Sequence, residues 1–513
     1  MYGSNLMDAV ENNHAVHDSV SSEQTLDIDT SLNMTDHKDR NDGCDEHPKK
    51  LNEQMDFAGL KTEHKISCLN TTSQEAISPA WVFGFNHSVP LINLSDDQSS
   101  VVFYVSAHLL ILFDIKNNRQ KILRGHCNEV MSITCSGNKR WLASGDRGID
   151  NTVIVWDVKT GEAVRTIRKP HEHGVLSIAL TKDARYLATL SADPFDQSFA
   201  IWNWTTGSNS PHCHAKISGE MSFQTKITFN SDNYFHLSTT GDHQVIFYSW
   251  NNEEKNMVAY APSLKDEDFK QKIGQFSCTL YIPNKYIAIT GTSTGLLVIW
   301  ESDKQPSKGE NSETPYKRAS KLIPLHEKGI TFVTITDCHP CGKCIVTGDS
   351  GGRVKFLDDN FMLLFWYDDL KCGPVNCVSF ATTSLFTEKN QPSFIESVKG
   401  KDYPTCATIT AEPFIVEDFI VSTSNAAMIS VKVEGGFQKI ILRDHDSDVN
   451  GLTTHPVMNH VAACSHSGLL KVYDYESKLV IAMKSFGVNN PIQSCVYDKT
   501  GQFIGQLFVY KLP

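Results

Sequence analysis

The sequence predicts an all-β protein, a β-propeller of four-stranded sheets, or blades, arranged around a central axis. Seven blades are expected, with eight as the alternative. Two observations support this prediction. Residues 125–157 alternate strand-length apolar runs with turns, and the apolar residue near the end of the third run recurs along the chain. Since a single such sheet cannot bury both of its faces, copies stacked beside it are needed to complete a core.

Residues 125–157 define the repeating unit. Its apolar runs, at 130–135, 141–144 and 152–156, are rich in β-branched and aromatic residues and are separated by Gly, Asn, Ser and Asp. Such runs are typical of antiparallel strands joined by tight turns. The unit opens with Gly-His and closes with Trp-Asp.

Aligning the last apolar strand of this unit finds eight copies. The aligned anchor residues are Phe113, Trp156, Trp202, Tyr248, Trp300, Leu357, Val431 and Tyr473. The first four lie 43, 46 and 46 residues apart, close to the period of about 40 to 45 residues typical of propeller blades. The later intervals of 52, 57 and 74 residues fit the same unit with insertions, and the last interval is 42. The polar insertions at 302–321 and 382–413 are therefore predicted to be loops.

Residues 1–76 are predicted to form a disordered acidic tail. The first 60 residues hold thirteen Asp or Glu and four Lys or Arg, a net charge of -9, which leaves -3 of the total of -12 for the rest. Such a polar segment cannot bury enough apolar surface to offset its chain entropy. Because the remaining chain is nearly neutral and shows no clustered basic residues, we expect no nucleic-acid partner.

Ordered structure is expected from residue 77, and the aromatic stretch 81–85 predicts a strand. The first propeller is expected over residues 77–444. Residues 445–513 hold the eighth anchor and two further apolar runs. They are predicted to begin a second, truncated propeller or, alternatively, to form an eighth blade.

Composition also limits the cellular setting. No apolar run reaches the roughly 18 residues that a membrane span needs, and the first residues lack the features of a secretory signal. The fourteen cysteines show no disulfide-type spacing. A reduced, cytoplasmic setting with no membrane partner is therefore expected.

Two sets of polar residues recur at corresponding places in the second and third blades. They are His126, Ser144, Asp150 and Trp156, and then His171, Thr189, Asp196 and Trp202. Imidazole, hydroxyl, carboxylate and indole groups can hydrogen-bond to one another inside a blade, where an unpaired group would cost about 1 to 3 kcal/mol. We therefore predict structural tetrads and no catalytic residue. The alternative is a hydrolase whose nucleophile relay uses Ser144, His126 and Asp150.

Two short motifs resemble metal sites. Residues 338–344 (CHPCGKC) resemble half of a zinc site, but no second ligand pair lies nearby and the Pro and Gly fit a turn. Residues 444–451 (DHDSDVNG) begin like a calcium loop, but Val449 and His455 stand where Gly and Glu are required. We therefore expect neither a metal site nor a cofactor.

Several stretches carry a resemblance to known proteins. They are residues 81–85 (WVFGF), 102–108 (VFYVSAH), 140–143 (RWLA), 153–157 (VIVWD), 183–189 (DARYLAT) and 346–349 (VTGD). Through them the chain from about residue 81 onward resembles the WD-repeat family. Within it, the chain is similar to the cilia- and flagella-associated family of the calmodulin- and spoke-associated complex, at the base of a radial spoke. The first two stretches are also similar to the echinoderm microtubule-associated-protein-like family, whose propellers bind tubulin.

This resemblance implies a non-catalytic scaffold of the ciliary or flagellar axoneme that supports radial spoke assembly and motility. It implies axonemal proteins of the spoke-base complex as partners, calmodulin among them, and a location in the cytoskeleton of the cilium or flagellum. The alternative that it implies is a microtubule-binding propeller with tubulin as its partner.

Overall fold

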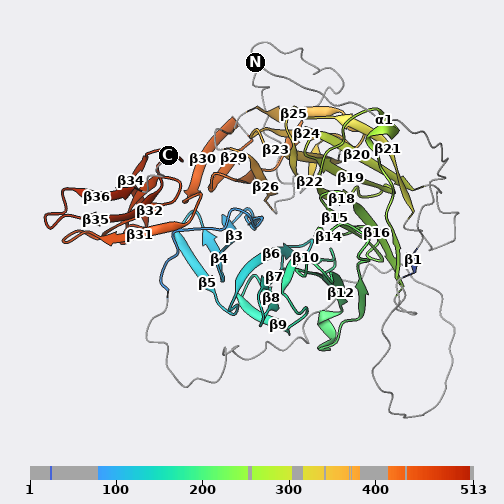
Figure 1. Cartoon of the computed structure of the whole chain (residues 1–513), viewed down its shortest axis with the longest axis horizontal. Helices are drawn as coiled ribbons and strands as arrows, with labels where there is room; N and C mark the ends of the chain where they lie inside the picture. Colours follow the sequence, from blue (N-terminus) through green and yellow to red (C-terminus); the bar gives the residue numbers. More distant parts are fainter. Residues whose placement is uncertain are drawn as a thin grey trace, which may run out of the picture.

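A computed structural model describes residues 24–25 and 79–508, apart from 252–256, 303–315, 340–341, 369, 371–372, 382–413 and 434–435. The described strands form eight sheets of four or five strands and one two-stranded hairpin. Figure 1 shows seven of these sheets around a common centre, with the eighth sheet and the hairpin projecting from the rim. The prediction of an all-β propeller is confirmed, and its ring has seven blades.

Sheets one to four follow one another along the chain. Sheet one contains β2 (Ile92–Asn93), β3 (Val101–Ser106), β4 (Leu109–Asp114) and β5 (Arg119–Leu123). Sheet two contains β6 (Glu129–Cys135), β7 (Trp141–Arg147), β8 (Thr152–Asp157) and β9 (Glu162–Arg168). Sheet three contains β10 (Val175–Leu180), β11 (Leu187–Ser191), β12 (Ser198–Trp202) and β13 (Cys213–Lys216). Sheet four contains β14 (Gln224–Phe229), β15 (His236–Gly241), β16 (Val245–Trp250) and β17 (Met257–Tyr260), with β1 (Gln24–Thr25) paired to β17.

Sheets five to seven complete the ring. Sheet five contains β18 (Phe276–Tyr281), β19 (Ile287–Thr292), β20 (Leu296–Ser302) and β21 (Lys317–Pro324). Sheet six contains β22 (Ile330–His339), β23 (Gly342–Asp349), β24 (Val354–Leu357) and β25 (Leu363–Tyr367), with β27 (Ile415–Val416) beside β22. Sheet seven contains β26 (Val375–Phe380), β28 (Phe419–Thr423), β29 (Ala427–Lys432) and β30 (Phe437–Arg443).

The remaining strands lie outside the ring. Sheet eight contains β31 (Val449–Thr454), β32 (His460–Ser465), β33 (Leu469–Asp474) and β34 (Leu479–Ser485), and the hairpin contains β35 (Ile492–Tyr497) and β36 (Ile504–Phe508). Two short helices, η1 (Trp204–Thr206) and α1 (Asp266–Phe269), lie in connections between strands. In the described part of the chain, no helix is long and apolar enough to cross a membrane.

The eight anchor residues occupy one structural position. Each lies in the third strand of its sheet, opposite a residue of the second strand. The pairs are Phe113 with Val102, Trp156 with Leu142, Trp202 with Leu187, Tyr248 with Leu237, Trp300 with Ala288, Leu357 with Ile345, Val431 with Phe419 and Tyr473 with Val461. The sequence repeat is therefore a repeat of strand register, which confirms the basis of the fold prediction.

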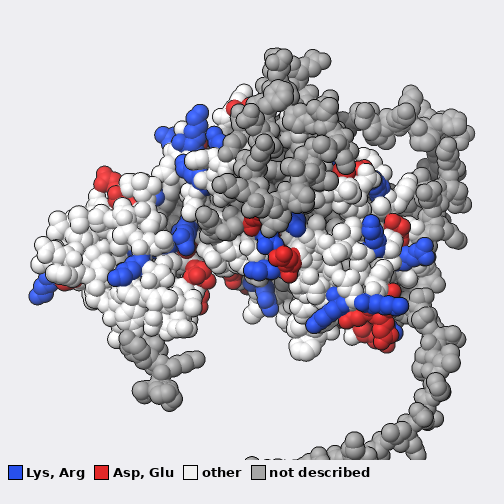
Figure 2. Space-filling model, turned by 90° about the horizontal axis from the view of Figure 1, so that it is seen from above, with Lys and Arg blue, Asp and Glu red and all other residues white. Residues whose placement is uncertain are grey.

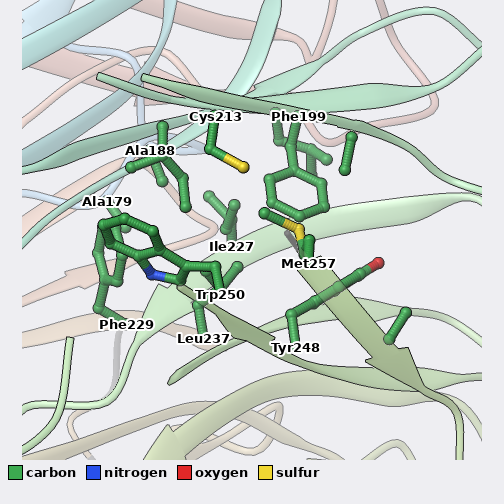
Figure 3. Packing of buried hydrophobic residues seen from close by; sticks show 14 of the residues in the cluster. Ala179, Ala188, Phe199, Cys213, Ile227, Phe229, Leu237, Tyr248, Trp250 and Met257 are labelled. Carbon is green, nitrogen blue, oxygen red and sulfur yellow. The ribbon is translucent and has the colours of Figure 1, made fainter. Parts of the chain in front are cut away.

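Neighbouring sheets bury their faces against each other. Figure 3 shows this between sheets three and four, where Phe199 and Cys213 of one sheet face Tyr248, Trp250 and Met257 of the other. The ring centroids of Phe199 and Tyr248 are 4.7 Å apart in an edge-to-face arrangement. Burying one such side chain fully contributes about 1.5 to 3 kcal/mol, so stacking supplies the stability that an isolated blade would lack.

The ring closes where sheet seven meets sheet one. Asn376 Nδ2 donates a hydrogen bond to the His87 carbonyl at 2.9 Å, and Ser379 Oγ accepts the Asn93 N–H at 2.8 Å. Asn376 is the residue left unpaired where the register of β26 shifts between Val375 and Cys377. A side chain at this irregularity therefore joins its own sheet to the next one.

The same two contacts join sheet eight to the hairpin. Asn450 lies at the register shift of β31 and donates from Nδ2 to the Ile492 carbonyl at 3.1 Å. Thr453 Oγ1 accepts the Tyr497 N–H at 3.3 Å. Sheets seven and one thus contact each other directly, and sheet eight is not inserted between them.

Three predictions about secondary structure differ from the structure. Residues 81–85 are not a strand. Residues 317–321, predicted to belong to a loop, form the start of β21. Most of the predicted disordered tail, 1–76, lies outside the described residues, but Gln24 and Thr25 form β1.

Lys139 is predicted to stabilise the closure. Its Nζ donates to the Asn93 carbonyl of sheet one at 2.8 Å and to the Phe380 carbonyl of sheet seven at 2.6 Å, while burial lowers the pKa of Lys139. We expect Lys139→Met to lower the free energy of unfolding by about 1 to 3 kcal/mol, because two carbonyls lose their donor. Urea denaturation measures this, with the exposed Lys159→Met as control. Equal stability of the two variants would contradict the assigned role.

Candidate functional site

The structure brings together three of the four residues predicted for the first tetrad. The Nε2 of His126 lies 2.7 Å from the Oγ of Ser144, and the indole N–H of Trp156 donates to the same oxygen at 2.9 Å. Ser144 lies opposite Ile154 in the pairing of β7 with β8, so Trp156, two residues further, projects from the same face. The set is enclosed between sheets, with Ser144 fully buried.

The carboxylate of this set comes from Asp146 and not from Asp150. The Nδ1 of His126 lies 3.0 Å from Asp146 Oδ2, and Asp146 is fully buried. Asp150 is exposed in the turn between β7 and β8, where its carboxylate pairs with Lys169 at 2.8 Å. The prediction of Asp150 was wrong because strand alternation places the residue two after Ser144 on the same face.

The structure also brings together only three of the four residues predicted for the second tetrad. The Nε2 of His171 lies 2.9 Å from Thr189 Oγ1, which also accepts the indole N–H of Trp202 at 3.0 Å. Asp196 is exposed and pairs with Lys216 at 2.8 Å, so its prediction was wrong. The position two after Thr189 holds Ser191, and this set has no carboxylate.

A third set in sheet six was missed from the sequence. His326 Nε2 lies 2.9 Å from Thr347 Oγ1, and its Nδ1 lies 2.9 Å from Asp349 Oδ2. Two signals could have found it. Thr347-Gly-Asp349 repeats the Ser-Gly-Asp of sheet two, and His326 stands four residues before Ile330, as His126 stands four residues before Val130.

The ionisation of the third set follows from its burial and pairing. Burial lowers the pKa of His326 and outweighs the opposing hydrogen bond to Asp349. Burial acts to raise the pKa of Asp349, but hydrogen bonds from His326 and from the Arg353 N–H outweigh it, and the net pKa lies below its ordinary value. The set therefore holds a neutral imidazole against a charged carboxylate.

Other sheets keep parts of the pattern. In sheet five, Trp300 donates to Thr290 Oγ1 at 2.8 Å, and Thr290 lies 2.8 Å from Thr279. In sheet eight, His445 is buried, and its ring nitrogens have no hydrogen-bond partner among the described residues. The hydroxyl position there is occupied by Ala463, opposite Lys471. The set is thus complete in sheets two and six and partial or absent in the other sheets compared, which fits a role in packing.

The hydrogen-bond distances among Ser144, His126 and Asp146 resemble those of a nucleophile relay, but the surroundings of these side chains do not. All three side chains are buried, and the Ser144 oxygen already accepts a hydrogen bond from the packed Trp156. A substrate would have to displace that indole to reach the oxygen. The site fits a structural role better than acyl transfer.

In the part of the chain that the structure describes, the two metal-like motifs bring no metal ligands together. Cys338 and Cys344 are buried on adjacent strands, and Cys341 lies outside the described residues. The Asp444 carboxylate accepts the Phe85 N–H at 2.9 Å. Within the described ranges, no three His, Cys, Asp or Glu side chains are placed to share a metal ion.

Loops of sheets two and three expose large apolar side chains. Ile149 is 83% exposed between β7 and β8, and Phe195 is 93% exposed between β11 and β12. Both loops join a second strand to a third strand, so they lie on the same face of the ring. Hydrogen bonds hold each loop: Asn151 Nδ2 donates to the Gly148 carbonyl at 2.8 Å, and Asp193 Oδ1 accepts the Phe195 N–H at 2.9 Å. Elsewhere, on the face shown in Figure 2, basic and acidic side chains are interspersed.

Substitutions in sheet two distinguish the observed set from the predicted one. We expect Asp146→Asn and Ser144→Ala each to lower the free energy of unfolding by about 1 to 3 kcal/mol, because His126 loses a buried partner. The matched Asp150→Asn should change it by less than about 0.5 kcal/mol, as is usual at an exposed site. Chemical denaturation measures all three. A larger loss for Asp150→Asn than for Asp146→Asn would contradict the assignment.

Buried histidines predict acid sensitivity. Burial lowers the pKa of His171, His236 and His445 to about 4, from an ordinary value of 6.5. Between these two values the unfolded chain binds protons that the folded chain does not, so stability must fall as pH falls from 6.5 towards 4. Each histidine contributes about 1.4 kcal/mol per pH unit in that window.

His171→Gln should therefore reduce the slope of unfolding free energy against pH between pH 6.5 and 4.5. The exposed His243→Gln serves as control for the substitution of a histidine by glutamine. Asp444, whose pKa burial raises, acts in the opposite direction but equally in all variants. Identical slopes for His171→Gln and the unsubstituted chain would contradict a neutral, buried His171.

Comparison with known proteins places the chain in a family. The family model described as the CFAP251 N-terminal domain matches residues 77–436, and the model for the WD domain, G-beta repeat, matches residues 436–474. A solved β-propeller domain, Cps50 (Swd1) from "Myceliophteria thermophila", is similar with a TM-score of 0.37 and 12% identity over 74% of this chain and 93% of that chain.

Curated relatives agree with the family models. Cilia- and flagella-associated protein 251 is 32% identical in Pongo abelii and in Mus musculus, over 84% and 90% of this chain and 36% and 35% of theirs. Echinoderm microtubule-associated protein-like 4 from Homo sapiens is 22% identical over 76% of this chain and 36% of its own. The chain thus spans about a third of the length of these relatives. It belongs to the CFAP251 family of cilia- and flagella-associated WD-repeat proteins.

Proposed function

We propose that this chain is a non-catalytic scaffold of the cilium or flagellum, whose propeller holds partner proteins on its exposed loops. The proposal is supported by the name that its relatives carry, cilia- and flagella-associated protein 251. We further propose that it acts in the axoneme, at the base of a radial spoke, and supports spoke assembly and motility. Its partners would be axonemal proteins of that complex, calmodulin among them.

One observation supports the scaffold role: the side chains that could react are buried, whereas large apolar side chains are exposed on loops. Ser144, His126 and Asp146 are buried within sheet two, whereas Ile149 and Phe195 are exposed on hydrogen-bonded loops. Exposed aromatic and aliphatic side chains on a rigid support are typical of protein-binding surfaces. A surface of this kind can bind a partner but supplies no group for a reaction.

The second candidate is a microtubule-binding propeller. It is favoured by the similarity to echinoderm microtubule-associated protein-like 4, whose name states a microtubule association. The two candidates differ in what the chain touches directly. In the first the contact is another axonemal protein, and in the second it is tubulin.

The domain division is also a proposal. We propose that residues 77–444 form one propeller and that 445–513 begin a second one. Support comes from the contacts of Asn450 with Ile492 and of Thr453 with Tyr497, which resemble the contacts between sheets seven and one of the ring.

Fractionation tests the proposed function. A tagged copy of the chain is expressed in cells with motile cilia, and axonemes are isolated and extracted with increasing salt. We expect the chain to remain with the axoneme and to be released together with radial spoke proteins. The purified chain should not co-sediment with microtubules of pure tubulin. Co-sedimentation there would favour the microtubule-binding candidate, and absence from axonemes would contradict both.

Surface variants connect this test to the structure. Ile149→Asp combined with Phe195→Asp should weaken axonemal retention by about tenfold, which corresponds to about 1.4 kcal/mol of binding free energy. The control is Tyr286→Asp, because Tyr286 is 50% exposed in a turn between first and second strands, on the opposite face. Equal retention of both variants would show that the loops of sheets two and three do not bind the partner.

A further inference from the structure

Residues 81–85 lie outside every sheet but are held firmly against sheet one. Gln120 of β5 binds both backbone groups of Val82: its Oε1 accepts the Val82 N–H at 2.9 Å, and its Nε2 donates to the Val82 carbonyl at 2.9 Å. Trp81 packs edge-on against the anchor Phe113, with ring centroids 5.9 Å apart. Gln120 thus makes the two hydrogen bonds to Val82 that a neighbouring strand would make to one residue. The segment is held in place, but it does not add a strand to the sheet.

The same segment contacts sheet eight and the link that leads to it. The ring of Phe83 lies 4.7 Å from that of Tyr473, the anchor of sheet eight, between centroids. The Phe85 N–H donates to Asp444 Oδ2 at 2.9 Å, and the same carboxylate accepts the His445 N–H at 2.6 Å. Asp444 is the first residue after β30, so the segment binds the start of the connection between the ring and sheet eight.

Residue 84 has no room for a side chain, because the Asp444 carboxylate lies against it. A Cβ atom at Gly84 would lie 2.7 Å from Asp444 Oδ2, and the φ of Gly84 is not in the left-handed region. Any residue could therefore adopt the backbone conformation, but only glycine allows the carboxylate to approach so closely. The close approach of residue 84 and Asp444 is thus a specific feature of this joint.

A buried lysine secures the other side of the link. Lys471 of β33 is fully buried, and its Nζ donates to the Arg443 carbonyl at 2.6 Å. Burial raises the pKa of Asp444 and lowers the pKa of Lys471 to about 8. Arg443 is therefore hydrogen-bonded to sheet eight through Lys471, and Asp444 is hydrogen-bonded to the segment 81–85 through Phe85.

We propose that residues 81–85 are a clasp that holds sheet eight at a fixed position on the rim of the ring. The clasp binds sheet one through Gln120 and Phe113, and it binds sheet eight through Tyr473 and Asp444. Without it, sheet eight would be oriented by the five-residue link at 444–448, by the Lys471 contact with Arg443 and by Asn118 Nδ2, which donates to the Ser477 carbonyl at 3.5 Å. With it, a partner bound to sheet eight is held at a constant angle to a partner bound to the ring.

Hydrogen exchange and X-ray scattering of the whole chain test the clasp. Gly84→Ala forces the Asp444 carboxylate away, so exchange at the Phe85 amide should rise at least about tenfold, as expected when a local contact opens more often. The maximum dimension from small-angle scattering should increase as sheet eight moves. The matched control is Gly219→Ala, because nothing lies within 4 Å of a Cβ at that position. Peptides covering β7 and β8 should exchange equally in both variants.

Two outcomes would overturn the proposal. If exchange at Phe85 is the same in Gly84→Ala and Gly219→Ala, the segment does not depend on Asp444. If exchange rises but the scattering is unchanged, the segment does not hold sheet eight. Should Gly84→Ala disturb the ring itself, Phe83→Leu, which removes the stacking on Tyr473, is measured in the same way and judged by the same two outcomes.

A double substitution distinguishes loss of the specific contact between Gly84 and Asp444 from general destabilisation. If Gly84 is required only to accommodate Asp444, then Gly84→Ala should add little to the effect of Asp444→Ala on exchange at Phe85. Additive effects of the two substitutions would mean that Gly84 and Asp444 act separately, and the clasp as described would be wrong.

Discussion

The structure depends on one constraint: a small twisted sheet with two apolar faces is stable only when another sheet covers each face. Phe199 of sheet three and Tyr248 of sheet four are nearly inaccessible because each covers the other. No single blade could retain this burial alone, and in a closed ring no blade is left with an uncovered face. The repeated register of the anchors is the way the chain satisfies this constraint.

Polar groups inside the blades are consequences of the same packing. Once sheets stack, the histidines in the connections before the first strands of sheets two, three, six and eight are enclosed, and their nitrogens need partners. Sheets two and six provide a hydroxyl and a carboxylate, sheet three provides a hydroxyl alone, and sheet eight provides neither to His445. The complete sets resemble a catalytic relay in composition, but their burial supports the structural role that we propose for them. The proposed scaffold function uses the outer surface, where Ile149 and Phe195 are exposed.

Much of the fold could be predicted from the sequence, because register leaves a periodic signal. The spacing of Trp156, Trp202 and Tyr248 was enough to place them in equivalent strands, as the pairing confirms. The carboxylates could not be placed by distance along the chain, since Asp150 and Asp146 differ by only four residues. Only strand alternation from Ser144 separates them. His326 was missed because the anchor of its sheet is Leu357, not a tryptophan, so its set lacked the most visible member.

The clasp could not be predicted because its contacts follow no period. Residues 81–85 have the composition of a strand, yet Gln120 occupies the place where a strand partner would bind Val82. The contact with Asp444 joins positions 359 residues apart and depends on how sheet eight leaves the ring. Such long-range contacts leave no trace in local sequence patterns.

Seven blades close the ring by direct contact between sheets seven and one. Residue-specific photo-crosslinking from position 379 tests it most directly, because Ser379 Oγ lies 2.8 Å from the Asn93 nitrogen. The account predicts crosslinks to the peptide that contains Asn93. Crosslinks to β31 instead would place sheet eight inside the ring and contradict it.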